Sequence, residues 1–268
     1  MRYGRVSAGG LIFLLATGLW CAAALAAQSE LPRPVLLLKR IREHMKSRLE
    51  QVPNYTCLET VERSEQVSNA AKFKPLDTVR IEVAEVDGKE LFARPGQKFD
   101  ESNPAALAKG GFMANGLFAL HARALFIRDT ARFTYAGEDE IDGRKLVRYD
   151  YQVPLEVSGY HIVVPGRVAV VGYHGSLWSD PQTLDAYHFR FVADNIPPQL
   201  GVVDSGVEID YQNVTIGGAE ALLPRRADMI ATEASGTRLR NITTFTNCKH
   251  YGSESTLTFD SAEPSKKK

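Results

Sequence analysis

The residue types that could do chemistry in this sequence do not stand at the spacings that known reactions require. None of the six histidines belongs to a His-Glu-x-x-His, His-x-His or Cys-x-x-Cys pattern, so the sequence predicts no metal ligands. His174 lies close to Ser176, but the stretch around them is not the Gly-x-Ser-x-Gly nucleophile motif. The carboxylates of 138–140 and Asp142 lack the alternating spacing of a calcium loop. We therefore expect no catalytic residue, no enzyme activity and no cofactor.

Two of the three cysteines form a candidate disulfide. Cys21 lies in an N-terminal segment that we expect to be removed, which leaves Cys57 and Cys248 as an even pair in an oxidising compartment. We predict that they form a structural bond between the two ends of the domain. The alternative is a reactive thiol, for which His250 offers a nearby imidazole.

The N-terminal segment has the three parts of a secretory signal peptide. Arg2 and Arg5 precede an apolar run over 11–25, and small residues follow, with cleavage expected at Ala26 or Ala27. No later run reaches the roughly 18 apolar residues of a membrane helix. An uncleaved N-terminal anchor is the alternative. The chain thus divides into a signal peptide (1–27), a single mature domain (28–260) and a flexible basic tail (261–268), and we expect a periplasmic or secreted protein without an integral membrane span.

The overall charge argues against a nucleic-acid partner. The 268 residues include 32 Lys and Arg against 32 Asp and Glu, a formal net charge of zero. No basic stripe is present that could neutralise a row of phosphates.

One amphipathic helix and a long series of strands account for most of the chain. Apolar residues recur every three or four positions over 35–52, which predicts a helix that ends before Pro53. Beyond it the dominant period becomes two, and Asp87-Gly88 and Asp142-Gly143 stand at hairpin turns. Pro224 separates two predicted strands, 220–223 and 226–232. Because the connections are short, sequence neighbours should pair as an antiparallel meander. The expected fold is α+β: an N-terminal amphipathic helix, then a large antiparallel meander that forms a curved sheet or an incomplete β-barrel with a helical lid or plug.

The lid or plug is the segment that interrupts the strands. Residues 116–127 are predicted to form a helix that is apolar nearly all round, and Gly110 and Gly111 precede it as a possible hinge. Such a helix either fills the concave face of the sheet as a plug or covers a ligand cavity as a lid. The candidate ligand-binding residues here are Phe112, Met113, Leu117, Phe118, Leu120 and Leu125.

The order of these parts resembles a known superfamily. A signal peptide, a helix that ends at Val52-Pro53-Asn54-Tyr55 and a Thr-rich strand are similar to the opening of periplasmic lipoprotein carriers of the LolA/LolB type. Leu91-Phe92-Ala93-Arg94-Pro95, followed by Phe99, is similar to the aromatic-x-x-Arg-Pro stretch of that family, and the stretch from Trp178 to Thr183 resembles its W-x-D-P-x-T hairpin. Secreted bacterial proteins of no assigned function share the Val-Pro-Asn-Tyr-Thr-Cys opening.

The resemblance implies a half-barrel whose hydrophobic cavity takes acyl chains under a helical lid, with Arg94 at the position that holds the lid and Trp178 as a further ligand-binding candidate. We therefore expect an exported carrier that shelters an acyl chain, a lipoprotein or another apolar ligand. One alternative is a non-catalytic cell-envelope module that binds a protein partner and no ligand. A hydrolase that uses His174 or His250 is the second alternative.

Overall fold

The computed structural model describes residues 31–68, 70–99, 104–107, 113 and 120–252. The expected signal peptide, the hinge glycines, the basic tail and three of the candidate ligand-binding residues lie outside the described residues: Phe112, Leu117 and Phe118.

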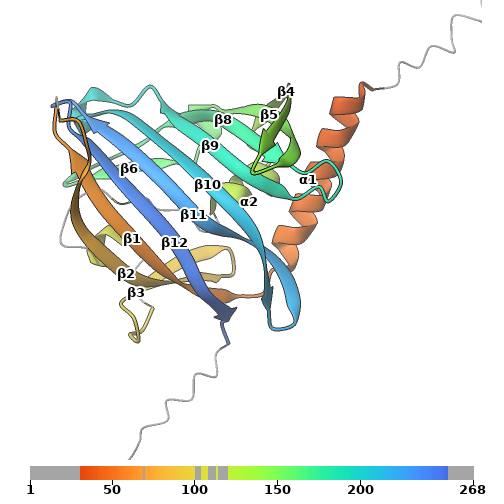
Figure 1. Ribbon diagram of the computed structural model, residues 1–268, viewed down its shortest axis with the longest axis horizontal. Coiled ribbons are helices and arrows are strands. Elements are labelled where there is room, and N and C mark those ends of the chain that lie inside the picture. The colour runs from red at the N-terminus through yellow and green to blue at the C-terminus, as the bar shows by residue number, and fades with distance from the viewer. Residues whose placement is uncertain (1–30, 69, 100–103, 108–112, 114–119, 253–268) are drawn as a thin grey trace, which may run out of the picture.

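Ten strands form one antiparallel sheet that curls into an open half-barrel (Figure 1). Their order across the sheet is β3-β2-β1-β12-β11-β10-β9-β8-β5-β4, and the two outer strands, β3 and β4, do not pair with each other. The barrel is therefore incomplete, as the sequence predicts. The strands are β1 (Tyr55–Gln66), β2 (Lys74–Val86), β3 (Lys89–Ala93), β4 (Arg132–Ile141), β5 (Arg144–Val153), β8 (Gly172–Ser179), β9 (Ala186–Asp194), β10 (Val202–Ile216), β11 (Ala219–Glu233) and β12 (Arg238–His250), with β6 (His161–Val164) and β7 (Arg167–Val170) in a separate hairpin.

In the part of the chain that the structure describes, two α-helices pack against this sheet, and both overlap the predicted helical segments 35–52 and 116–127. The amphipathic helix α1 (Arg33–Gln51) begins with a proline in its first turn, where a missing backbone N–H costs nothing. The short helix α2 (Leu120–Phe126) lies inside the half-barrel (Figure 1). Three 3₁₀ turns, Pro104–Leu107, Leu155–Val157 and Pro198–Leu200, lie in the connections.

The pairing of neighbours in sequence holds for most of the sheet, with two exceptions. The first strand pairs with the last one, β1 with β12, and β5 pairs with β8 because β6 and β7 leave the main sheet. The predicted break at Pro224 is wrong, since β11 continues through it. The register between β10 and β11 shifts at this point, between Asp210 and Tyr211, and a bulge is where a strand tolerates a residue without a backbone N–H.

The strand register shows which side chains share the inner face, defined here as the face against which α2 packs. Directly paired residues lie on the same face of a sheet. One row of pairs crosses nearly the whole sheet on the inner face and is apolar apart from one threonine: Val79, Val61, Thr243, Ala227, Ile209, Phe189, Leu177 and Tyr149.

The inner face carries two hydrophobic clusters. The helix-covered cluster lies on β5, β8, β9, β10 and part of β11, where Ile41 and Met45 of α1 and Leu125 of α2 pack into it with no exposed surface. The second, here called the β1–β3 wall, joins β1, β2 and β3 to β12 and the adjoining ends of β10 and β11. Its buried members are Tyr55, Cys57, Val61, Ile81, Val83, Phe92, Met113, Ile216, Ala221, Leu223 and Phe245.

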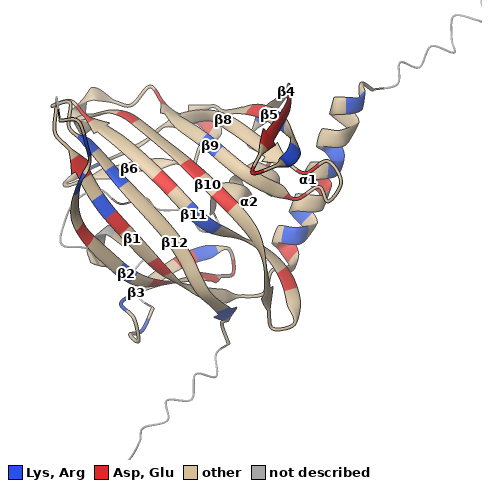
Figure 2. Ribbon diagram, viewed as in Figure 1, with Lys and Arg blue, Asp and Glu red and all other residues tan. Residues whose placement is uncertain are grey.

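Charged residues of both signs are spread along the strands and α1 (Figure 2). In the described part of the chain, no helix has the length and apolar character to cross a membrane.

Candidate functional site

Helix α2 is held inside the half-barrel by a histidine in an aromatic box. The ring of His121 stacks on Phe191 with 4.2 Å between ring centroids, and the edge of Phe189 lies at 5.5 Å. Tyr173 is 5.6 Å away on another side. His121 Nε2 lies 3.0 Å from the hydroxyl of Tyr151, which itself donates to the backbone carbonyl of Arg190 at 3.3 Å. His121 Nε2 is therefore the donor in this chain of hydrogen bonds.

Burial keeps this histidine uncharged. It is 8% exposed, and desolvation lowers its pKa from the usual 6.5 to about 3. A neutral ring can stack within the box without the cost of a buried cation. The contacts of this ring pack α2 against β5, β8 and β9 and fix its position there.

Two buried carboxylates of the β2–β3 hairpin hold the other side of α2. A carboxylate oxygen of Glu90 accepts a hydrogen bond from the backbone N–H of Leu120 at 3.2 Å. Glu85 lies 3.5 Å from the guanidinium of Arg123, which also donates to the carbonyl of Leu49 at the end of α1. Glu85 is directly opposite Glu90 in the β2–β3 pairing. Like charges at such positions repel, so the contacts to α2 offset part of that cost.

The β1–β3 wall is covered differently from the helix-covered cluster. In the described part of the chain, neither α1 nor α2 contributes a residue to it; Met113 packs into it, and Val52 and Leu107 lie against it as partly buried neighbours. Its surface is apolar, with Val61, Val83 and Phe92 each at most 2% exposed. The wall is thus a second apolar region of the inner face, separate from the helix-covered cluster.

One acidic side chain interrupts this apolar wall. Glu59 lies two residues from Val61 on β1, on the inner face, and is 5% exposed. Desolvation, with repulsion from Glu90 as a second cause, raises its pKa from 4.5 to about 8. Glu59 is not among the site residues predicted from the sequence. The sequence does carry a signal for it, because alternation along this strand places Glu59 on the same face as Tyr55, Cys57 and Val61.

The structure separates the predicted ligand-binding residues. Leu125 is fully buried in the helix-covered cluster, Leu120 begins α2, and Met113 is 9% exposed on the β1–β3 wall. Arg94 is exposed in the bend after β3. Trp178 follows the inward-facing Leu177, so it lies on the outer face, where its indole N–H donates to Asp139 at 2.8 Å.

The predicted disulfide is present. Cys57 and Cys248 are bonded across the neighbouring strands β1 and β12, with 191 residues of sequence separation. The bond lies beside a register shift between these strands, and Cys57 is part of the β1–β3 wall. The bond therefore ties the wall to the remainder of the sheet.

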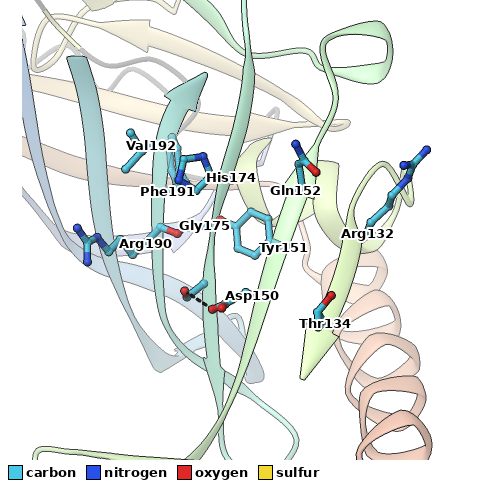
Figure 3. Close-up of a pocket in the computed structure, with 11 residues that line it drawn as sticks. Arg132, Thr134, Asp150, Tyr151, Gln152, His174, Gly175, Arg190, Phe191 and Val192 are labelled. Atoms are coloured by element: carbon cyan, nitrogen blue, oxygen red, sulfur yellow. Dashed lines mark hydrogen bonds between the residues drawn. The ribbon is translucent and has the colours of Figure 1, made fainter. Parts of the chain in front are cut away.

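A polar pocket of about 620 Å³ opens on the outer face across β4, β5, β8 and β9 (Figure 3). Paired outer-face residues line it: Thr134, Asp150, Ser176 and Arg190 in one row, and Arg132, Gln152, His174 and Val192 in the next. Its floor is Gly175, together with Tyr151 and Phe191.

The histidine and serine in this pocket do not form a catalytic pair. Ser176 donates to Asp150 at 2.6 Å, whereas His174 Nδ1 lies 2.6 Å from Asp194. Over the described residues, His, Cys, Asp and Glu side chains form no group that could hold a metal ion.

The fold and site define a class of protein: an α+β half-barrel with an N-terminal helix along one side and a second helix packed within. No protein-family model and no curated protein matches the chain. Its fold has likenesses among solved structures. A DUF1329 family protein from Desulfovibrio piger matches at 13% identity and a TM-score of 0.43, over 79% of this chain and 92% of that one.

Two further solved structures are similar to this chain. An outer membrane lipoprotein-sorting protein domain from Vibrio parahaemolyticus matches at 13% identity and a TM-score of 0.43, over 78% of this chain and 90% of that one. A LolA superfamily protein from Nitrosomonas europaea matches at 14% identity and a TM-score of 0.38, over 80% and 93%.

Proposed function

We propose that the protein is a non-catalytic periplasmic carrier that holds an acyl chain or another apolar ligand against the β1–β3 wall. The observation that supports this proposal is the contrast between the two halves of the inner face. The helix-covered cluster includes residues of α1 and α2, whereas the buried apolar side chains of the wall include none from these helices in the described chain. Each methylene group buried there would contribute about 0.8 kcal/mol to binding.

Helix α2 separates the two halves and is the candidate lid. It is held by polar contacts at Leu120, His121 and Arg123, while Leu125 packs among fully buried residues. The core packing favours a fixed plug for α2 itself. Ligand entry would then occur beside α2, over β1 to β3.

The first test is native mass spectrometry of the mature protein, isolated from the periplasm without detergent. A mass that organic extraction removes supports the carrier and identifies its cargo. Val61→Phe, which adds a ring on the wall, should abolish that mass. Glu62→Phe adds the same ring on the outer face of the same strand and should leave it. Absence of any bound mass, together with no uptake of an added apolar probe, would contradict the proposal.

A second candidate function is a cell-envelope module that binds a protein partner. The pocket on the outer face supports it, because its charged and polar lining residues, among them Arg132, Asp150 and Arg190, offer groups that a protein partner could contact. Crosslinking in intact cells from a photoreactive residue at position 132 should capture a partner in that case. Crosslinking from Lys39, on the exposed face of α1, is the control.

A further inference from the structure

Glu59 is an acidic side chain in apolar surroundings. On its own strand the neighbours on the same face are Cys57 and Val61, and the residues paired with it on either side are Ile81 of β2 and Phe245 of β12. All four are buried at 3% exposure or less. A carboxyl group in such a place costs several kcal/mol if it is ionised or lacks a hydrogen-bond partner.

No contact in the described chain offsets the free-energy cost of burying this carboxyl group. No hydrogen bond and no ion pair to Glu59 is present there, and burial and repulsion are the causes of its raised pKa. Glu59 keeps 5% of its surface exposed, and its side chain is on the inner face of the sheet.

The surrounding charges also keep this carboxyl protonated. The arginines of the inner face are engaged elsewhere, Arg63 with Asp77 and Arg123 with Glu85. Glu90 repels a charge on Glu59. With its pKa raised to about 8, Glu59 is mainly a neutral acid near pH 7, with one O–H group to donate.

We propose that Glu59 recognises the polar end of the ligand by donating a hydrogen bond to the carbonyl oxygen of an uncharged acyl ester or amide, whose hydrocarbon chain lies on the β1–β3 wall. This inference rests on the proposed carrier function. A plain hydrocarbon would leave the buried O–H without a partner. A fatty-acid anion could accept from the O–H of Glu59, but it would place a negative charge close to Glu85 and Glu90. The ester or amide alone satisfies the donor and adds no charge.

The test compares three probes of similar chain length: methyl laurate, tridecane and laurate. We expect the wild-type protein to bind the ester about tenfold more tightly than the hydrocarbon, which is the range of one hydrogen bond, and to bind the anion least. Glu59→Leu should abolish the preference for the ester and keep hydrocarbon binding. Glu59→Gln keeps an N–H donor and should keep the preference, as should Glu62→Leu on the outer face of the same strand.

A pH series tests the same donor without the Leu variant. Between about pH 6 and pH 9 the wild-type preference for the ester should fall as Glu59 ionises, and in Glu59→Gln it should stay constant. The other charged or titratable groups on the inner side of the surrounding described elements include Tyr55 and Arg63 of β1, Asp77 and Glu85 of β2, Glu90 of β3, Tyr211 of β10, and His121 and Arg123 of α2. All are retained in Glu59→Gln, so the difference between the two proteins isolates Glu59.

The outcomes separate the two proposals. If the wild type binds none of the three probes, the carrier function fails. If it binds the ester and the hydrocarbon equally, or if Glu59→Leu keeps the preference, the carrier stands and the role of Glu59 is wrong.

Discussion

At the scale of single residues, His121 and Glu59 show how burial selects a charge state. Both side chains can ionise, and both are at least nine-tenths buried on the inner side of the sheet. The histidine meets an aromatic box and a tyrosine hydroxyl, so its neutral form is satisfied. The glutamate has apolar neighbours and no hydrogen-bond partner in the described chain, so burial and the nearby Glu90 favour its neutral form. Their effects on stability should therefore depend on pH with opposite signs.

The His121 prediction concerns the stability of the folded protein at acid pH. Its pKa in the folded protein is about 3, below the usual 6.5, so the unfolded chain binds the proton first as the pH falls. The stabilisation is complete above about pH 6.5 and is lost by about 1.4 kcal/mol per pH unit as the pH falls toward 3. His121→Gln keeps an N–H donor and removes this titration. Urea unfolding should show the stability difference between wild type and variant shrinking in acid, and a constant difference from about pH 4 to 7 would refute it.

The Glu59 prediction concerns the stability of the folded protein as the pH rises from about 4.5 to 8. Its pKa in the folded protein is about 8, above the usual 4.5, so the folded state binds the proton more tightly. The contribution to stability is complete below about pH 4.5 and is lost as the pH rises toward 8. Glu59→Gln should therefore gain stability relative to the wild type between those pH values, by urea unfolding. Equal pH dependence in the two proteins would show that Glu59 is not held neutral.

At the scale of elements, one glycine determines how closely β8 approaches β9. A Cβ built on Gly175 would lie 2.0 Å from the carbonyl oxygen of Arg190, a backbone atom that cannot move away without breaking the sheet. The missing side chain also leaves room for Tyr151, paired with Gly175, to reach that same carbonyl. The aromatic box around His121 thus depends on Gly175, because a side chain at this position would not fit.

Gly175→Ala should destabilise the protein by about 2 kcal/mol or more, because the added methyl group has no space. Gly206→Ala is the matched control in β10, where the added atom would be 3.7 Å from its nearest neighbours. Thermal unfolding of both variants measures the difference. Similar melting temperatures for the two would show that β8 and β9 adjust to the methyl group.

At the scale of the whole molecule, the pairing of β1 with β12 joins the two ends of the domain. The hairpins of β1, β2 and β3 continue the main sheet through this one pairing, and they carry most of the β1–β3 wall. The disulfide between Cys57 and Cys248 lies across it. Any ligand site on the wall therefore depends on a contact between segments that are 191 residues apart.

Replacement of both cysteines by alanine should lower the free energy of unfolding by up to about 5 kcal/mol, the chain-entropy figure for so long a loop. Hydrogen exchange should then show β1, β2 and β3 opening before β8 and β9. Uniform exchange across the sheet in the double variant would contradict a local role for the bond.

The sequence by itself determined the elements and the cysteine pair. Apolar residues spaced every three or four positions predicted α1, and alternation with Asp-Gly turns predicted the strands. An even number of cysteines after a predicted signal peptide predicted the disulfide. These signals are local or compositional, so the sequence alone carries them. Only the tertiary structure decided the pairing of β1 with β12, the continuation of β11 through Pro224, the outward position of Trp178 and the inward position of Glu59. Alternation places side chains on two faces, but which face is buried depends on the strands and helices that pack against it. The candidate site lies on that long-range arrangement, so spacing along the chain did not reveal it.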